Sequence, residues 1–315
     1  SAYAEVSLPG GCAIGTRPID IYLKILKEMN IKYSINNGYI VAKRDGPIKG
    51  LNFKLEKKSV GCTHFFLMLA CIANGTSKLS NASCEPEVIH LGLLLNKMGA
   101  KIKGLGSKKI IIEGVKKLNG VTEIIPSDRI ETGTFAIAVS ATGGKVKLEN
   151  TNYEENKLLF NILEKTGSII NKSKNSISIE KNHNKIYAAN IKTSPYPGFP
   201  TDLQAQIMAL MTISNGKSEI KENIFENRFM HVQELVRMGA NIKLDKDRAI
   251  IKGVRRLNGA NVMATDLRAS ASLIIAGLVA TGTTKISRIY HLDRGFYNLE
   301  NKLNNCGASI KRISE

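Results

Sequence analysis

Residues 98–120 read MGAKIKGLGSKKIIIEGVKKLNG, and residues 238–259 read MGANIKLDKDRAIIKGVRRLNG. Both stretches open on Met-Gly-Ala, continue through alternating apolar positions, and close on Gly-Val, two basic residues and Leu-Asn-Gly. Internal similarity over a segment of this length indicates one supersecondary unit that is used repeatedly. The fold can therefore be predicted from the repeat before single elements are assigned.

A shorter period lies inside this repeat. Four apolar stretches each end in a glycine-containing turn, at residues 73–76, 141–144, 214–217 and 280–283. After each turn we expect a short strand, as at residues 145–148, then a helix, a strand pair and a second, very apolar helix. This order predicts a βαβαββ unit that is used several times, with four full returns of its helix-Gly-strand element and a fifth over residues 19–35 that lacks its strand-rich front part. We therefore expect the chain to begin inside a unit.

Residue types at the predicted helix ends agree with this order. The first helix of a unit ends in the glycine that usually forms a C-terminal cap, at Gly99, Gly167, Gly239 and Gly307. The second helix begins near a residue that caps helix N-termini well, at Ser59, Asp128, Asp202 and Asp266.

Composition limits the class of protein. The 315 residues are 43% hydrophobic and 23% charged, which is typical of a globular protein with room for two domains. No apolar run predicts a membrane span, and there is no signal-peptide pattern. The net charge is +18, but the lysines are scattered and no basic arm or RNA-binding aromatic motif occurs, which argues against a nucleic-acid partner. The five cysteines form no Cys-x-x-Cys pair, which argues against a zinc site or disulfide framework and favours a cytoplasmic location.

Residues 8–20, LPGGCAIGTRPID, carry the most distinctive local chemistry. Glycines around Cys12 allow the backbone to approach a ligand closely. Pro18 and Asp20 are typical of the first turn of a helix, and Arg17 adds a fork of donors for phosphate or carboxylate. The pattern predicts a thiol-bearing loop that leads into an anion-binding helix N-terminus. A surface turn with an incidental cysteine is the alternative, because thiol reactivity depends on pKa and exposure.

Taken together, these segments resemble the enolpyruvyl transferase family. The matching segments follow the family order, at residues 8–20, 57–61, 85–87, 128–134, 199–206, 225–231, 264–270 and 290–295. The resemblance implies an α/β (α+β) fold of two inside-out α/β barrel domains, each built from three βαβαββ units, with the N-terminal domain incomplete here. Residues 1–126 would form a partial first domain with the cysteine loop and UDP-binding segments. Residues 127–315 would form a second domain with an aspartate base and an arginine cluster.

The resemblance also implies a reaction. The enolpyruvyl group of phosphoenolpyruvate would be transferred to the 3-hydroxyl of UDP-N-acetylglucosamine, with release of phosphate, as the first committed step of peptidoglycan synthesis. These two small molecules are the implied partners; no cofactor and no metal are implied, and a monomer is expected. Two alternatives stay open. One is a 5-enolpyruvylshikimate-3-phosphate synthase-like transferase, and the other is a substrate-binding chain without activity of its own.

Roles for single residues come from the same resemblance. Cys12 would be the proton donor, form an adduct with phosphoenolpyruvate and be the target of fosfomycin. Arg17 would hold phosphate, and Asp202 would contact the sugar hydroxyl as its base, although on local grounds Asp202 is an N-cap. Further implied substrate contacts are Pro18, Ile19, Asp20 and Ile21 at the uridine, Lys57, Lys58, Ser59, Val60 and Gly61 at the diphosphate, the backbone of Ile224, and Arg228, Arg268 and Arg294, with Glu85 and Arg129 as additional candidates.

The cysteine assignment can be tested directly. Cys12→Ser should abolish covalent modification by fosfomycin, because the hydroxyl is a far weaker nucleophile than a thiolate. Intact-mass spectrometry before and after incubation would detect the adduct. An adduct of unchanged mass on the variant would identify another of the five thiols as the target.

Overall fold

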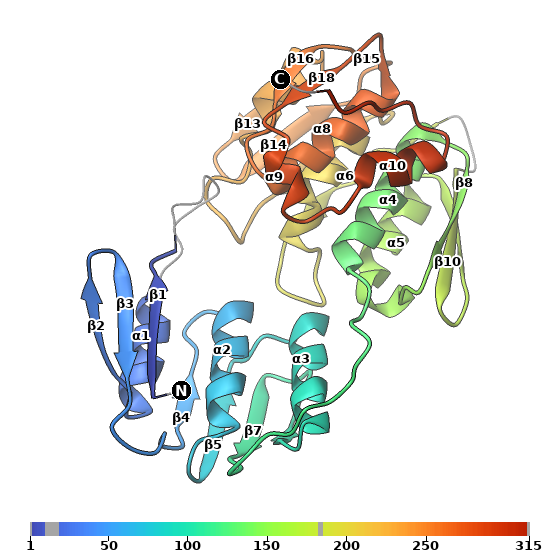
Figure 1. Ribbon diagram of the computed structural model, residues 1–315. Helices are drawn as coiled ribbons and strands as arrows, with labels where there is room; N and C mark the ends of the chain where they lie inside the picture. The colour runs from blue at the N-terminus through green and yellow to red at the C-terminus, as the bar shows by residue number, and fades with distance from the viewer. Residues whose placement is uncertain (1, 10–18, 182–184, 314–315) are drawn as a thin grey trace. The chain divides into compact units, whose positions relative to one another are not determined.

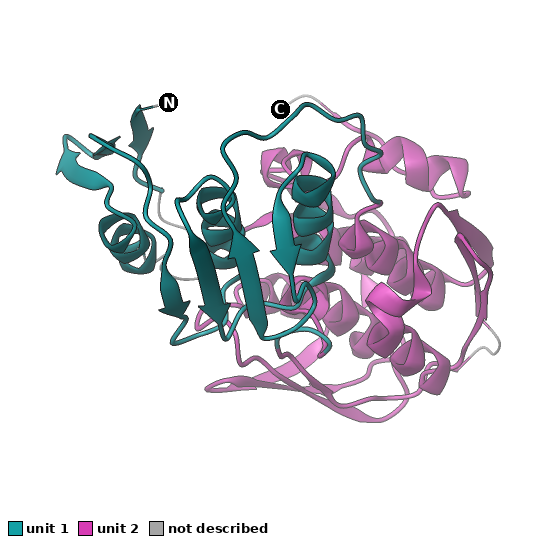
Figure 2. Cartoon of the chain, turned by 90° about the horizontal axis from the view of Figure 1, so that it is seen from below, with its two compact units in different colours: residues 1–12, 16–126, 195–197 teal, residues 13–15, 127–194, 198–315 magenta. Residues whose placement is uncertain are grey.

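The computed structural model describes residues 2–9, 19–181 and 185–313 (Figure 1). These residues form two compact units (Figure 2). Unit 1 comprises residues 2–9, 19–126 and 195–197, and unit 2 comprises residues 127–181, 185–194 and 198–313. The chain passes from one unit to the other after Pro126.

Unit 1 contains a three-stranded sheet and a four-stranded sheet with their connecting helices. Its elements are β1 (Tyr3–Ser7), α1 (Asp20–Glu28), β2 (Lys32–Asn36), β3 (Tyr39–Lys43), β4 (Asn52–Lys54), α2 (Val60–Ala70), β5 (Thr76–Ser80), α3 (Pro86–Lys97), β6 (Lys101–Lys103) and β7 (Lys109–Glu113).

Unit 2 contains a three-stranded sheet, a four-stranded sheet and two two-stranded sheets. Its elements are α4 (Arg129–Thr142), β8 (Lys145–Glu149), η1 (Tyr153–Asn156), α5 (Lys157–Lys165), β9 (Ser168–Lys172), β10 (Ser176–Lys181), β11 (Ile191–Lys192), η2 (Thr201–Leu203), α6 (Gln204–Thr212), β12 (Lys217–Lys221), α7 (Val232–Arg237), β13 (Asn241–Asp245), β14 (Arg248–Lys252), β15 (Leu257–Asn258), β16 (Asn261–Met263), α8 (Leu267–Val279), β17 (Ala280–Thr281), β18 (Lys285–Ser287), α9 (Tyr290–Asp293) and α10 (Leu299–Asn305).

The predicted βαβαββ unit is confirmed at two of its four predicted places, whereas the other two give a three-stranded sheet and two-stranded sheets among the described residues. One sheet has the order β4-β5-β7-β6 and another the order β11-β12-β14-β13. In each, the first pair is parallel and joined through a helix, α2 or α6, whereas the other pairs are antiparallel. A second helix, α3 or α7, stands between the second and third strands in sequence. The two similar stretches quoted above therefore supply the same two antiparallel strands to two sheets.

The predicted helix ends agree with the structure at most positions. The four C-terminal glycines all have left-handed backbone, with φ of 102°, 109°, 93° and 95° at Gly99, Gly167, Gly239 and Gly307. Ser59, Asp128 and Asp266 each accept backbone N–H groups at the start of α2, α4 and α8. These residues satisfy donors that have no partner inside the helix.

The prediction that Asp202 caps a helix is wrong. Helix α6 begins at Gln204, and Asp202 lies in the short 3-10 turn η2, whose N-cap is Pro200. The Asp202 carboxylate forms ion pairs with two arginines instead. A carboxylate that accepts charged donors is not available to the backbone of its own helix.

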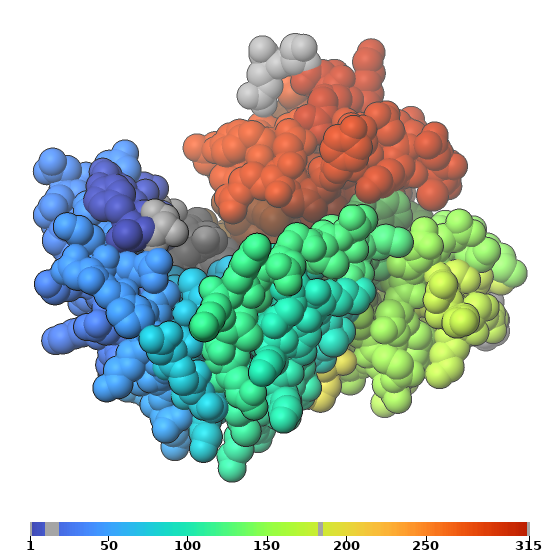
Figure 3. Space-filling view, turned by 60° about the horizontal axis from the view of Figure 1, so that its bottom comes forward, coloured from blue at the N-terminus to red at the C-terminus, as the bar shows by residue number. Residues whose placement is uncertain are grey.

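The core of unit 2 is helical, as expected for an inside-out arrangement. Helix α6 packs against α8, and α4 packs against both (Figure 1). All nine residues of α6 are buried, as are most residues of α4 and α8. A helix that is apolar all round needs cover on every side, so the strands lie outside these helices. The C-terminal residues after α10 lie on the surface of unit 2 (Figure 3).

No helix within the described ranges combines the length and apolar character needed to cross a membrane.

The Gly-Val step of the repeat has a steric explanation. A Cβ at Gly114 would overlap the carbonyl oxygen of Ala73, and one at Gly253 would overlap that of Ser214. The Gly114 amide donates to Gly75 O at 3.0 Å, and the corresponding amide of the second copy makes the same bond. The chain therefore presses against the turn that ends α2 or α6, and only glycine fits there.

Gly114→Ala should lower the free energy of unfolding by about 1–3 kcal/mol, the usual cost of forcing atoms into a filled site. Gly120→Ala is the matched control from the same Gly-Val-Lys-Lys-Leu-Asn-Gly run, because a Cβ there meets nothing; its change should stay within about 0.5 kcal/mol. Urea denaturation of both variants measures the difference. Equal destabilisation would contradict the steric explanation.

Candidate functional site

The N-terminal ends of the three buried helices of unit 2 lie close together. Arg129 is the first residue of α4, Asp202 precedes α6 by two residues, and Arg268 is the second residue of α8. Arg268 and Asp202 are in contact, and the charge of Arg129 also acts on Asp202. The partial positive charge at each helix N-terminus adds to that of the arginines. This end of the helical core therefore favours anions.

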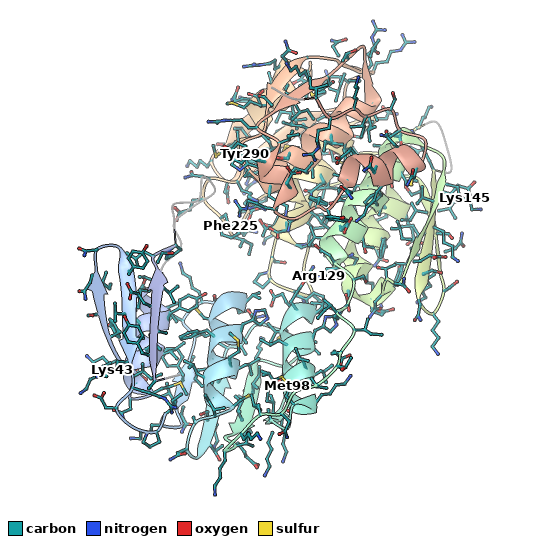
Figure 4. All side chains as sticks on the ribbon, in the orientation of Figure 1. Lys43, Met98, Arg129, Lys145, Phe225 and Tyr290 are labelled. Atoms are coloured by element: carbon teal, nitrogen blue, oxygen red, sulfur yellow. The ribbon has the colours of Figure 1, made fainter. Side chains whose placement is uncertain are left out.

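Asp202 bridges two arginines. Arg228 Nη2 donates to Oδ1 at 2.8 Å, and Arg268 Nη2 donates to Oδ2 at 2.9 Å. The guanidinium groups stand over aromatic rings, Arg228 over Phe225 at 5.4 Å and Arg268 over Phe296 at 5.8 Å (Phe225 is labelled in Figure 4). The arginine side chains are only 3% and 13% exposed, whereas that of Asp202 is 39% exposed. A ligand can therefore reach the carboxylate.

The ionisation state of Asp202 follows from this arrangement. Burial alone would raise the pKa of the carboxyl, but the charges of Arg268 and Arg228, the hydrogen bond from Arg268 and the charge of Arg129 together outweigh it. The pKa of Asp202 therefore lies below its ordinary value, and the group is a carboxylate at neutral pH. Arg268 Nη1 is buried and donates to no atom of the described chain, so the cluster retains one cationic donor.

The segments that carry these side chains are held by neighbouring polar groups. Asp266, the N-cap of α8, accepts the Arg268 amide at 2.8 Å and thereby orients the start of that helix. His231 is 1% exposed, and its ring N–H donates to the Arg228 carbonyl. Burial, opposed by the charge of Asp266, lowers the pKa of His231 to about 4, so the ring is neutral at neutral pH. It supports the loop that bears Arg228 rather than adding charge.

Sequence reasoning missed a buried carboxylate beside this cluster. Glu222 is 4% exposed and follows β12 directly. It accepts the hydroxyls of Thr193 and Thr201 and the amides of Ile224 and Phe225. A signal was available, because Ser218, Ile220 and Glu222 alternate along one inward face of the strand. An acidic residue on an inward face is unusual enough to indicate a special role.

In unit 1 the predicted diphosphate segment lies at the start of α2. Ser59 Oγ accepts the Cys62 amide at 3.2 Å, which confirms its capping role. Lys57 is exposed and Lys58 partly so, just outside the helix. Val60 and Gly61 open α2, and a Cβ at Gly61 would overlap the Tyr22 hydroxyl. A helix N-terminus that has no acidic residue in its first turn and lies beside two lysines is suited to bind phosphate.

The remaining predicted site residues are distributed as follows. Cys12, Arg17 and Pro18 lie outside the described residues. Ile19 is the N-cap of α1, and Asp20 and Ile21 form its first turn.

The last three candidates have surroundings of their own, and Ile224 is linked to the Asp202 segment through Glu222. Glu85 Oε1 accepts the Tyr196 amide at 3.3 Å within unit 1, and Ile224 is exposed in the loop after β12. Arg294 is exposed at the C-cap of α9 and forms no ion pair in the described part of the chain. Over the same residues, no group of three His, Cys, Asp or Glu side chains is placed to hold a metal ion.

Comparison with known proteins places these features in a family. The family model for EPSP synthase (3-phosphoshikimate 1-carboxyvinyltransferase) matches residues 1–303 of the sequence. A UDP-N-acetylglucosamine 1-carboxyvinyltransferase from Methylobacterium radiotolerans is 54% identical over 310 residues, which cover 98% of this chain and 72% of the relative. A protein of the same name from Rhodopseudomonas palustris is 53% identical, with 99% and 72% covered.

Solved structures show the same fold at lower identity. The enolpyruvyl transferase NikO from Streptomyces tendae superposes with a TM-score of 0.86 at 20% identity, over 98% of this chain and 74% of that one. EPSP synthase from Acinetobacter baumannii gives 0.76 at 20% identity, over 99% and 75%. Together these findings confirm the expected fold class.

The stability lost on replacement of Asp202 should depend on pH in a defined direction. Because the pKa of Asp202 is depressed in the folded chain, its ionised form stabilises the fold above the ordinary value of 3.8, and this contribution is lost as pH falls through the folded-state pKa. The thermal midpoint of Asp202→Asn should therefore lie below that of the parent protein at neutral pH, and the gap should narrow in acid.

The matched control is Asp45→Asn, which removes a carboxylate paired with exposed Lys32. Exposed pairs contribute little, so this variant should follow the parent protein at neutral pH. A gap for Asp202→Asn that widens in acid would contradict the sign of the effect.

Proposed function

The chain belongs to the EPSP synthase family of carboxyvinyltransferases, and we propose from this that it transfers the enolpyruvyl group of phosphoenolpyruvate to the 3-hydroxyl of UDP-N-acetylglucosamine. Phosphate is released, and the reaction is the first committed step of peptidoglycan synthesis. Relatives that are more than half identical over almost the whole chain support this choice of acceptor, because they are named UDP-N-acetylglucosamine 1-carboxyvinyltransferase. The EPSP synthase structures are related to the chain only distantly.

The proposed chemistry rests on the Asp202 cluster, which consists of Asp202, Arg228 and Arg268. The sugar hydroxyl must lose a proton as it attacks, and both substrates bring negative charge. Arg228 and Arg268 are the groups suited to phosphate and carboxylate oxygens. Asp202 is the exposed member of the cluster and can meet a hydroxyl.

The low pKa of Asp202 suggests how the substrates act together. A carboxylate held by two arginines is a weak base, and proton transfer is more effective when the pKa of the base lies nearer the working pH. An anionic substrate that draws one guanidinium away would remove part of this stabilisation and raise the pKa of Asp202. Phosphoenolpyruvate would thus both occupy the arginines and activate the base.

Roles for the remaining site residues follow from the same family resemblance. Cys12 donates the proton to the enol carbon and is the fosfomycin target, Arg17 holds phosphate, and Arg294 adds a ligand for phosphoenolpyruvate. Residues 18–21 contact uridine and residues 57–61 the diphosphate, with the Ile224 backbone at the sugar. Residues 1–126 thus form the first barrel domain with the cysteine loop, and residues 127–315 the second with the base and the arginines.

The cellular setting is part of the same proposal. We place the enzyme in the cytoplasm as a monomer, where cell-wall precursor synthesis would link it to cell shape and division. The four described cysteines, Cys62, Cys71, Cys84 and Cys306, are unpaired, which accords with a reducing compartment.

The assay is phosphate release with phosphoenolpyruvate and either UDP-N-acetylglucosamine or shikimate 3-phosphate as acceptor. We expect release only with the sugar nucleotide, together with a product of the corresponding mass. Asp202→Asn should reduce kcat at least about 100-fold, the lower range for loss of a general base. Glu219→Gln, which removes an exposed carboxylate paired with Arg248 of the same unit, is the control and should retain the parent rate.

Three other results of these assays would change the proposed function. A preference for shikimate 3-phosphate would overturn the acceptor. An unchanged rate for Asp202→Asn would overturn its role as base. Calorimetric binding of UDP-N-acetylglucosamine without phosphate release would favour the substrate-binding alternative.

A further inference from the structure

We propose that Glu222 is a positioning residue, which sets the distance between Asp202 and Arg228 by tying together the chain segments that carry them. This inference rests on the proposed function, because the two side chains it positions are those assigned to proton removal and anion binding. Glu222 itself is buried and touches no substrate.

The Glu222 carboxylate is buried and is surrounded by hydrogen-bond donors. Glu222 is 4% exposed and has no ion pair with any cation of the described chain. Burial of a carboxylate is costly unless hydrogen bonds replace its water. Four donors do so here, with Oε1 accepting Thr193 Oγ1 at 2.9 Å, Ile224 N at 2.8 Å and Phe225 N at 3.2 Å, and Oε2 accepting Thr201 Oγ1 at 3.0 Å.

The four donors restrict which side chain can occupy position 222. Two are backbone N–H groups, which can only donate. The Thr193 hydroxyl accepts the Asn223 amide at 2.9 Å, so its own proton is directed to Glu222. An ionised carboxylate, which only accepts, is the side chain that matches all four donors.

Three of the four donors belong to the chain segments that carry Asp202 and Arg228. Thr201 precedes Asp202 in the turn η2, so the bond to Oε2 holds the base from one side. Ile224 and Phe225 open the loop that carries Arg228, so the bonds to Oε1 hold it from the other side. The Arg228 guanidinium lies over the Phe225 ring at 5.4 Å.

The contacts form a closed circuit within unit 2. From Glu222 it runs through Thr201 to Asp202, across the 2.8 Å bond to Arg228, and back through Phe225. In a closed circuit of this kind a shift at one bond displaces the others. Loss of a bond at Glu222 should therefore move the base and the arginine relative to each other, and a displacement of about 1 Å at reacting groups can cost about 100-fold in rate.

Thr193 provides the cleanest test, because its side chain is completely buried and cannot contact substrate itself. Thr193→Val keeps the shape and removes the hydroxyl that donates to Glu222. We expect kcat to fall at least about tenfold. Thr193→Ser keeps the hydroxyl and should restore most of the parent kcat.

Glu222→Gln tests the carboxylate directly, with Glu234→Gln as the matched control. Glu234 is also buried in unit 2 and accepts a backbone amide, that of Met263 at 3.0 Å, but it has no bond to the Asp202 circuit. We expect kcat to fall at least about tenfold for Glu222→Gln only. Equal losses in both variants, or no loss in Glu222→Gln and Thr193→Val, would overturn the proposal.

Amide hydrogen exchange separates failure of this inference from failure of the proposed function. The Ile224 and Phe225 amides should be protected in the parent protein and exchange at least tenfold faster in Thr193→Val and Glu222→Gln, whether or not the chain shows transferase activity. Unchanged protection would overturn the network. Absence of activity in the parent protein would overturn the proposed function alone.

Discussion

One carboxylate shared by two arginines is the constraint around which unit 2 is arranged. Asp202 holds Arg228 and Arg268 at 2.8 and 2.9 Å, and these three residues come from η2, the loop after β12 and the start of α8. Nearly buried guanidinium groups need a counter-charge. Asp202 therefore offsets positive charge where the N-terminal ends of the three core helices meet, together with the caps Asp128 and Asp266.

The repeated architecture explains where that group comes from. Three apolar helices begin with a side chain that caps its own helix, at Ser59, Asp128 and Asp266. The remaining copy, third in chain order, also has an aspartate but starts its helix after a 3-10 turn, which frees the carboxylate of Asp202. The side chain that caps the helix in the other three copies therefore binds arginines in this one. The hydrogen bonds lost at the helix end are replaced by stronger, charge-assisted ones.

The polar groups behind the cluster give it a defined geometry. Buried polar networks are costly when a partner is lacking and rigid when all are present. Glu222 meets four donors, and His231 stays neutral beneath the loop of Arg228. Such support suits a site in which a small displacement changes the rate far more than the stability.

The amino-acid sequence by itself determined the repeat, the βαβαββ order, the glycine ends and three of the four helix caps, because each depends on neighbours a few residues away. Through family resemblance, the sequence also identified Asp202, Arg228 and Arg268 as residues of one substrate site. Only the tertiary structure decided that these residues meet, that Asp202 leaves its helix uncapped, and that Arg294 is not bonded to them. Contacts between residues 202, 228 and 268 depend on how separate repeats pack, and local patterns carry no information on that packing.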